Sequence, residues 1–273
     1  IEPAAESAGE CAGLGVAEQR RQLADRQAPA QVVQGQFAAY LVDQRRKAQV
    51  LFAQTALQQG PAVLRRAAAE LYGYLASLAG SVSLSAQVAC MVEQIGDARH
   101  ADARAACVLA LGEMYARLGG LRAAPLTKSV HTLALSLAPD PHPAVHCCAL
   151  EALASVAEAA GVAYEPYVES TLCLMTRLCA AATHEPEGGS VGSSNLRVHL
   201  PAYPGVARVL SALVGVLGPD LQAAEATRHW LYALLLHLAH DGGDAVPEAI
   251  VGLQRLELVV PSMLATRVWA DVL

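Results

Sequence analysis

Apolar positions recur along most of the chain with the spacing of an amphipathic helix. In the stretch 146–161, HCCALEALASVAEAAG, they return every three or four residues: Leu150, Leu153, Ala154 and Ala157. Positions with this spacing lie on one face of an α-helix, so they predict a helix with one buried face. Gly161 follows the run, and a glycine in this place is typical of a helix end.

The same pattern occurs three times in one register. Each copy opens with a basic residue or a histidine and ends at a glycine: 65–80, 104–119 and 146–161. The closing glycines are 39 and 42 residues apart, and a fourth copy ends 57 residues later at Gly218. A second apolar helix is expected after each glycine. In the third copy it carries a stripe made of Val168, Leu172, Met175 and Cys179.

Two helices in a period near 40 residues are typical of HEAT and armadillo repeats. One helix pair cannot bury both of its apolar faces, whereas stacked pairs bury a continuous core. We therefore predict an all-α protein, an α-solenoid of HEAT/armadillo-type helix pairs. A two-domain helical bundle would give similar helices, but not the same register three times.

The predicted repeats divide the chain into four segments. We expect a helical N-terminal part (1–60, with a long helix over 31–59), three HEAT-like repeats (61–182), a flexible insertion (183–201) and further helical repeats (202–273). The insertion contains EPEGGSVGSSN, whose Gly, Ser and Pro content favours a loop. In the last segment, helices are expected over 218–240, starting at Pro219, and over 245–257 and 260–273.

Composition supports the helical prediction. The chain has 273 residues, is 54% hydrophobic and only 4% aromatic, and alanine and leucine, both strong helix formers, carry the apolar content. The formal net charge is −6, and the basic clusters 45–47 and 65–66 are too short for the basic stripe of a nucleic-acid binder. We expect them on solvated helix faces, and we expect no nucleic-acid partner.

The distribution of the cysteines and of the apolar runs indicates in which cellular compartment the protein is expected. The seven cysteines are scattered through apolar helical patterns, so we expect free thiols in a reducing, cytoplasmic environment. The most apolar run, Trp230–Ala239, is too short to span a bilayer, and we expect no direct membrane insertion. The chain begins with Ile1 and shows no signal-peptide pattern, so we interpret it as an internal piece of a longer protein.

The stretch DPHPAVHCC, 140–148, is the first candidate for a metal site. His142 and His146 are four residues apart and two cysteines follow, which is a spacing known from zinc helices. However, His142 lies between two prolines, and a residue before proline is pushed out of the helical region. Neighbouring cysteines also point about 100° apart on a helix. We expect a turn followed by a buried helix, and no metal.

The sequence motifs and histidines that could indicate catalysis also have simpler structural explanations. GGSVG, 188–192, fits the nucleophile elbow of hydrolases, but that elbow needs a strand before the serine and a helix after it. His131, His229 and His237 fall on amphipathic helices and are expected to be packing or surface residues. Tyr164 and Tyr167 flank a proline and are expected to pack against the previous repeat. We assign no catalytic, cofactor-binding or metal residue, and we predict that the chain is not an enzyme.

Ordered segments resemble one family. DPHPAVH resembles the HEAT turn, with Asp97 and Arg104 in comparable places one unit earlier. The longer segments 83–95, 104–120, 136–175 and 205–222 resemble, in this order, the HEAT repeat-containing protein 5 family, and fungal members most closely.

The resemblance covers about Gly60 to Gln222 and implies a large cytosolic solenoid. Members work with the clathrin adaptor AP-1 at the trans-Golgi network and endosomes, peripheral to the membrane. The resemblance assigns no contact residue, and the oligomeric state stays open. Two alternatives remain: a HEAT scaffold of another machine, such as nuclear transport or phosphatase assembly, and a HEAT-fold enzyme acting on nucleic acid.

Overall fold

The computed structural model describes residues 42–57, 60–78, 81–97, 100–183, 202–241 and 243–261. The chain forms two compact units, Ile1–Leu51 and Phe52–Leu273. A helix over residues 42–57 holds the boundary between them. It covers the described part of the helix that the sequence predicts over 31–59.

The second unit consists of helices and short turns, with no strand in the residues described. The prediction of an all-α protein is confirmed. The α-helices are α2 (Ala62–Leu78), α3 (Ser81–Asp97), α4 (Ala101–Leu118), the short α5 (Gly120–Ala123), α6 (Thr127–Leu137), α7 (Pro143–Ala160), α8 (Val168–Thr183), α9 (Ala202–Leu217), α10 (Glu225–Asp241) and α11 (Val246–Val259). Short 3₁₀ turns join them: η1 (Ala124–Leu126), η2 (Gly161–Tyr167), η4 (Gly218–Gln222) and η5 (Gly243–Ala245).

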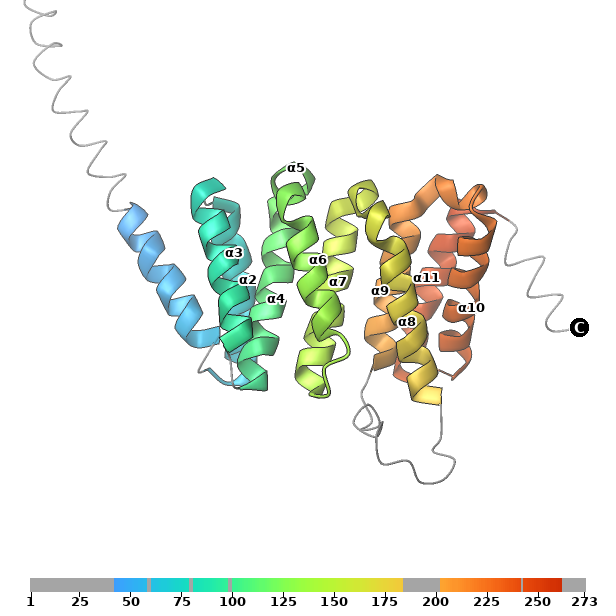
Figure 1. The fold of residues 1–273 in the computed structure, drawn as a ribbon, viewed down its shortest axis with the longest axis horizontal. Helices are drawn as coiled ribbons and strands as arrows, with labels where there is room; N and C mark the ends of the chain where they lie inside the picture. Colours follow the sequence, from blue (N-terminus) through green and yellow to red (C-terminus); the bar gives the residue numbers. More distant parts are fainter. Residues whose placement is uncertain are drawn as a thin grey trace, which may run out of the picture. The chain divides into compact units, whose positions relative to one another are not determined.

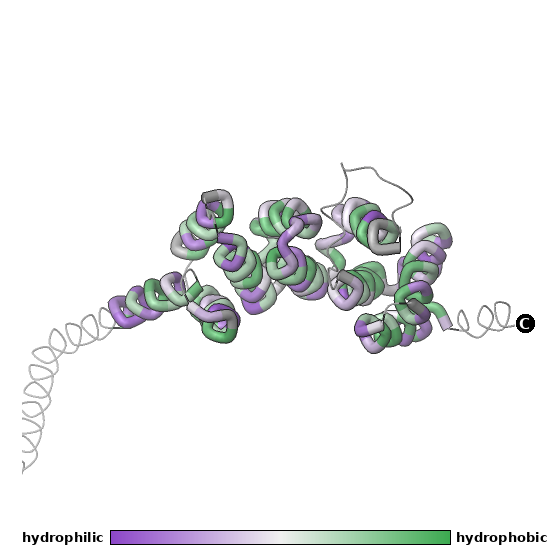
Figure 2. The backbone as a smooth tube through the Cα atoms, turned by 90° about the horizontal axis from the view of Figure 1, so that it is seen from below, coloured by the Kyte–Doolittle hydropathy of each residue, from purple (hydrophilic) through white to green (hydrophobic). Residues whose placement is uncertain are grey.

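These helices are arranged in two layers (Figure 1). In the first layer, α2, α4, α7, α9 and α11 pack side by side in chain order, each on the next. In the second layer, α3, α6, α8 and α10 each pack on the first-layer helix that follows them in the chain. Figure 2 views the helices nearly end-on and shows both rows. This is the repeated helix-pair stacking of an α-solenoid, as the repeat predicts.

Three of the four expected helix ends and the core faces of α7 and α8 are confirmed, while Gly80 lies outside the described residues. Gly119, Gly161 and Gly218 end α4, α7 and α9 with positive φ of 73°, 54° and 45°, a conformation that costs glycine little. Both predicted stripes are buried: Leu150, Leu153, Ala154 and Ala157 on α7, and Val168, Leu172, Met175 and Cys179 on α8.

One boundary prediction is wrong. Pro219 does not start a long helix over 218–240; it is the second residue of the 3₁₀ turn η4, and α10 begins only at Glu225. Proline suits the first turn of either kind of helix because it lacks an N–H that would stay unpaired there. The segment therefore turns for one short element before the second-layer helix begins. Helix α11 matches the helix expected over 245–257, while 184–201 and 262–273 lie outside the described residues.

Neighbouring first-layer helices approach closely at glycines. A Cβ added at Gly112 of α4 would lie 2.8 Å from Cα of Ala152 on α7, and one at Gly73 of α2 would lie 2.9 Å from the carbonyl oxygen of Glu113 on α4. A Cβ at Gly205 of α9 would lie 2.8 Å from a methyl carbon of Leu150. These glycines allow the backbones of successive repeats to pack at short range.

Candidate interaction surface

The stretch 140–148 forms a turn and the start of α7, as predicted. His142 is the residue before the helix and is extended, with φ −84° and ψ 121°, and Pro143 occupies the first helical position. The side chain of Asp140 accepts a hydrogen bond from the backbone N–H of His142 at 2.8 Å. His142 is exposed and His146 is buried, so the two imidazoles do not share a helix face.

His146 points into the packing between α7 and the end of α6. Its Nδ1 hydrogen-bonds the carbonyl oxygen of Ala138, so this nitrogen carries the proton, while Nε2 is buried without a partner. Burial lowers the pKa of His146, against a smaller opposite effect of the Ala138 bond. In the part of the chain that the structure describes, no three His, Cys, Asp or Glu residues come close enough to hold a metal ion.

The three histidines expected on amphipathic helices, His131, His229 and His237, contact neighbouring side chains. His131 is buried on α6 and its Nδ1 hydrogen-bonds the Tyr164 hydroxyl at 2.9 Å, and that hydroxyl also bonds Thr171 at 3.0 Å. The rings of His131 and Tyr167 lie 4.6 Å apart. The tyrosines therefore pack against the previous repeat, as predicted. His229 lies 3.9 Å from the Glu225 carboxylate, and His237 meets the edge of Tyr203.

Two helical stretches pass the length and hydropathy test for a membrane span: Pro143–Ala180 and Tyr203–Gln222. Neither stretch contains the uninterrupted apolar run that would predict a membrane span from the sequence. At least half of each apolar window is buried against neighbouring helices. Core packing therefore accounts for their hydropathy.

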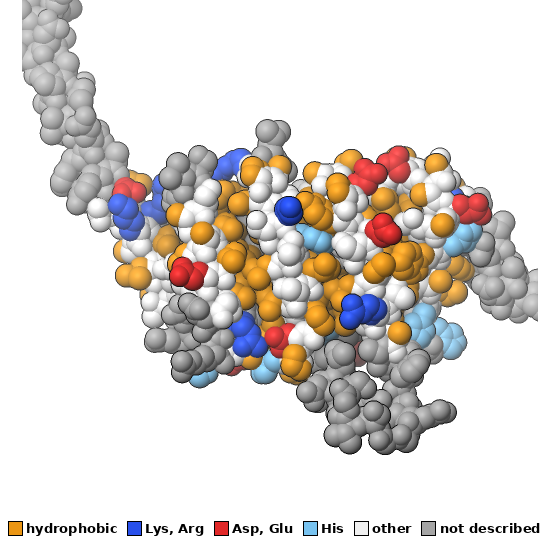
Figure 3. All heavy atoms as spheres, viewed as in Figure 1, with side chains coloured by type: hydrophobic (Ala, Val, Ile, Leu, Met, Phe, Trp, Pro, Cys, Tyr) orange, Lys and Arg blue, Asp and Glu red, His pale blue; other side chains and the backbone are white. Residues whose placement is uncertain are grey.

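Charged side chains do not form a continuous stripe on the face drawn in Figure 3, where hydrophobic side chains and other uncharged groups lie between them. Large apolar residues are exposed at several places in the second unit. The most exposed among the described residues are Phe52, Val63, Leu78, Val162 and Leu258, all above 60%. Single exposed apolar residues are common on protein surfaces, so they point to a site only where they adjoin a concave feature.

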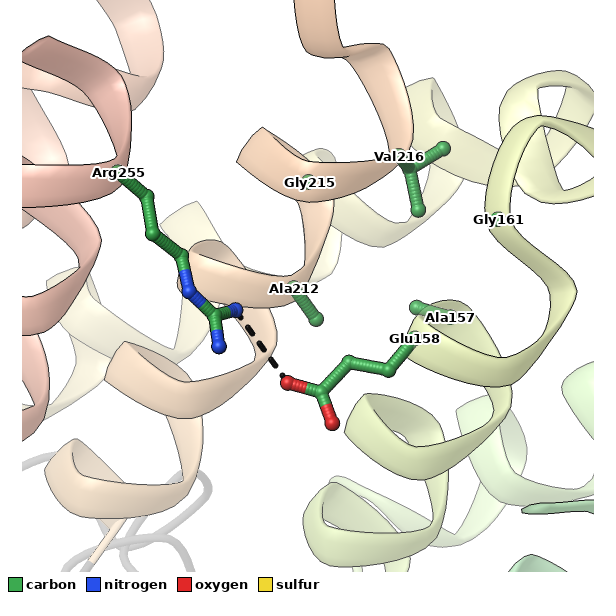
Figure 4. Close-up of a pocket in the computed structure, with 7 residues that line it drawn as sticks. All are labelled: Ala157, Glu158, Gly161, Ala212, Gly215, Val216 and Arg255. Carbon is green, nitrogen blue, oxygen red and sulfur yellow. Dashed lines mark hydrogen bonds and ion pairs between the residues drawn. The ribbon is translucent and has the colours of Figure 1, made fainter. Parts of the chain in front are cut away.

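Such a feature lies where α7, α9 and α11 meet. It is a hollow of about 340 Å³ lined by seven residues, shown in Figure 4: Ala157, Glu158, Gly161, Ala212, Gly215, Val216 and Arg255. Ala212 and Gly215 of α9 are small, so the helix between α7 and α11 leaves space above its backbone. Nothing lies within 4 Å of a Cβ added at Gly215.

An ion pair crosses this hollow. Arg255 of α11 and Glu158 of α7 reach toward each other over α9 (Figure 4), with Nη1 and Oε1 at 3.3 Å, and Nη1 also donates to the carbonyl oxygen of Ser211 at 3.3 Å. Both charged side chains are about two-fifths exposed. An exposed pair of this kind contributes about 0–1 kcal/mol to stability, so it shapes the surface more than it stabilises the fold.

A second cluster lies one and two turns earlier on the same helices. Glu151 of α7 accepts two hydrogen bonds from Arg66 of α2, at 3.1 and 2.8 Å. Arg208 of α9 lies 3.8 Å from the same carboxylate, too far for a hydrogen bond. Two guanidinium groups thus share one carboxylate, which leaves an excess of one positive charge.

Neither feature is predicted from the sequence, although α9 carries small residues on one face and α7 carries two Glu residues seven positions apart. They gave no signal because the partners come from helices far apart in the chain. The GGSVG motif lies outside the described residues. Among the described residues, the hollow brings together no set of side chains typical of a catalytic site, and its two charged side chains neutralise each other. The chain matches no protein-family model.

Proposed function

We propose that this chain is a non-catalytic HEAT-repeat scaffold that supports clathrin-adaptor AP-1-dependent transport between endosomes and the trans-Golgi network. The observation that carries the scaffold role is the stack of helix pairs, whose first layer brings α7, α9 and α11 together around an exposed hollow. Such a stack presents a long surface built from distant parts of the chain, as interaction solenoids do.

The trafficking assignment is supported by the ordered resemblance over about Gly60 to Gln222. That segment corresponds to α2 through η4, which is most of the described stack. By the same resemblance, the protein works in the cytoplasm and at the surface of trans-Golgi and endosomal vesicles, through protein partners. Cofactors are not required for such a role.

Leu153→Asp tests whether the stack is needed. Leu153 is fully buried on α7, and an unpaired charge there should cost several kcal/mol. Because repeats contact only their neighbours, loss of α7 should disturb the repeats on both sides. We expect the full-length protein with Leu153→Asp to lose AP-1 co-purification and to missort AP-1 cargo in cells.

Leu78→Asp is the matched control, since Leu78 is 63% exposed on α2 and the same substitution should leave the fold intact. Limited proteolysis of both variants reports whether α7 has unfolded. If Leu153→Asp is unfolded in this region while adaptor association and sorting stay normal, the segment is not part of a working AP-1 scaffold. Tight DNA binding by the wild-type chain at physiological salt would instead favour the nucleic-acid reading.

A further inference from the structure

The outer face of α9 forms a groove between α7 and α11. Arg208, Ala212 and Gly215 lie four and three residues apart, so they share one face of the helix. Ala212 and Gly215 line the hollow, whose walls carry Glu158 and Arg255. We define the α9 groove as this hollow together with Arg208.

The hollow in the groove has the size for one side chain of a partner. Its volume of about 340 Å³ is at the low end for small-molecule pockets, and its floor is made of small residues. Two exposed apolar residues are close in sequence to residues that line the hollow. Val162 directly follows Gly161 and is 70% exposed, and Leu258 lies one turn beyond Arg255 on α11 and is 82% exposed. An apolar anchor seated in a hollow is the usual centre of a protein interface.

The charged end of the groove favours an acidic partner. Arg208 is 43% exposed, and its guanidinium makes no hydrogen bond to any of the described residues. Arg66 uses two of its five N–H donors on Glu151, so donors remain on both arginines. A carboxylate placed here would meet the excess positive charge and unused donors, a geometry that gives strong charge-assisted bonds.

The spacing between the two parts specifies the partner. With a rise of about 1.5 Å per helical residue, Arg208 lies about 6 Å from Ala212 and about 10 Å from Gly215 along α9. An extended chain advances about 3.3 Å per residue, so an acidic and an apolar side chain two or three residues apart would reach both. We propose that the α9 groove binds a short extended segment of a partner protein that carries an Asp or Glu two or three residues from a large apolar side chain.

A nucleic acid fits this groove less well, because one excess charge supplies little of the phosphate neutralisation on which such binding depends. The proposal rests on the interaction role proposed above and names the kind of partner for that surface.

A library of random 12-residue peptides displayed on phage tests the proposal against the purified chain. Gly215→Leu fills the hollow, and because a Cβ at this position meets nothing within 4 Å, the fold should tolerate it. Gly96→Leu is the matched control: Gly96 is also an exposed helical glycine with open space around its Cβ, on α3. We expect selected peptides to combine Asp or Glu with a large apolar residue two or three positions away.

Binding of those peptides, measured by fluorescence anisotropy, should be lost in Gly215→Leu and unchanged in Gly96→Leu. Arg208→Gln should weaken it about tenfold, the effect of losing one charge-assisted hydrogen bond. Selected peptides without an acidic residue, or peptides that bind Gly215→Leu normally, would overturn the proposal. A Gly215→Leu protein that keeps AP-1 co-purification would refute the groove as the adaptor contact but leave the scaffold role standing.

Discussion

Arg104 and Asp140 join two successive repeats through one carboxylate. Nη2 of Arg104, in the first turn of α4, lies 3.2 Å from Oδ2 of Asp140 in the turn before α7. The other oxygen of Asp140 accepts the N–H of His142 at 2.8 Å. Asp140 therefore fixes the turn that starts α7 and ties it to the preceding first-layer helix. One repeat earlier, Arg65 of α2 and Asp102 of α4 form a comparable link at 3.0 Å.

Removal of this carboxylate should destabilise the stack. The Asp140 side chain is only 13% exposed, and hydrogen bonds to a charged group contribute about 1.5–3 kcal/mol each. We expect Asp140→Ala to lower the free energy of unfolding by about 2 kcal/mol in urea denaturation. Asp140→Asn keeps the acceptor for His142 and should lose about half as much. Equal losses in the two variants would show that the charge on Asp140, not the turn bond, carries the effect.

The periodic positions in the sequence were enough to predict the helices, their glycine ends and the buried faces of α7 and α8. Those properties are local, since a helix face and its end depend on residues within a few turns. The ion pairs between repeats, such as Arg65 with Asp102, are not predicted from the sequence, because they join different helices.

The candidate site could not be predicted in the same way. Glu158 and Arg255 are 97 residues apart, and they meet only because α9 lies between their helices and is small on that side. Arg66 and Glu151 are 85 residues apart and meet across α4 in the same manner. Contacts between helices that are not direct neighbours depend on how the helix between them is positioned in the stack. A local sequence pattern does not determine that position.

The close approach of α4 and α7 predicts opposite effects of alanine at two glycines. A Cβ at Gly112 would lie 2.8 and 2.9 Å from Cα and Cβ of Ala152, whereas one at Gly96 meets nothing within 4 Å. Gly96→Ala should stabilise the protein by up to about 1 kcal/mol through helix propensity. Gly112→Ala should destabilise it by about 1–3 kcal/mol because the helices must separate. Thermal unfolding of the two variants gives the comparison, and stabilisation by both would mean that α4 and α7 can move apart freely.

Thiol accessibility should differ sharply among the cysteines. Burial raises the pKa of Cys107, Cys148 and Cys179 to about 11, while Cys173 is exposed on α8. A pKa of about 11 instead of the ordinary thiol value of 9.0 lowers the fraction of reactive thiolate about 100-fold at pH 8. Iodoacetamide under native conditions should therefore label Cys173 first, as read by peptide mass spectrometry. After denaturation all four should react alike, and fast native labelling of Cys107 would place α3 and α4 in an open arrangement.

Two buried histidines predict that the protein loses stability in mild acid. Burial lowers the pKa of His131 and of His146 from the ordinary value of 6.5. Below pH 6.5 the unfolded chain therefore binds protons at these histidines that the folded chain does not, so their contribution to stability is constant above this pH and falls below it. The loss approaches about 1.4 kcal/mol per histidine for each pH unit until the folded pKa is reached. Urea denaturation at pH 7.5, 6.5 and 5.5 measures this loss of unfolding free energy.

Gln at position 131 retains a partner for Tyr164 without a titrating group, so His131→Gln should remove about half of the loss of stability between pH 6.5 and 5.5. An unchanged dependence in that variant would show that His131 is protonated in the folded protein and that its contacts with Tyr164 and Tyr167 do not shield it from solvent.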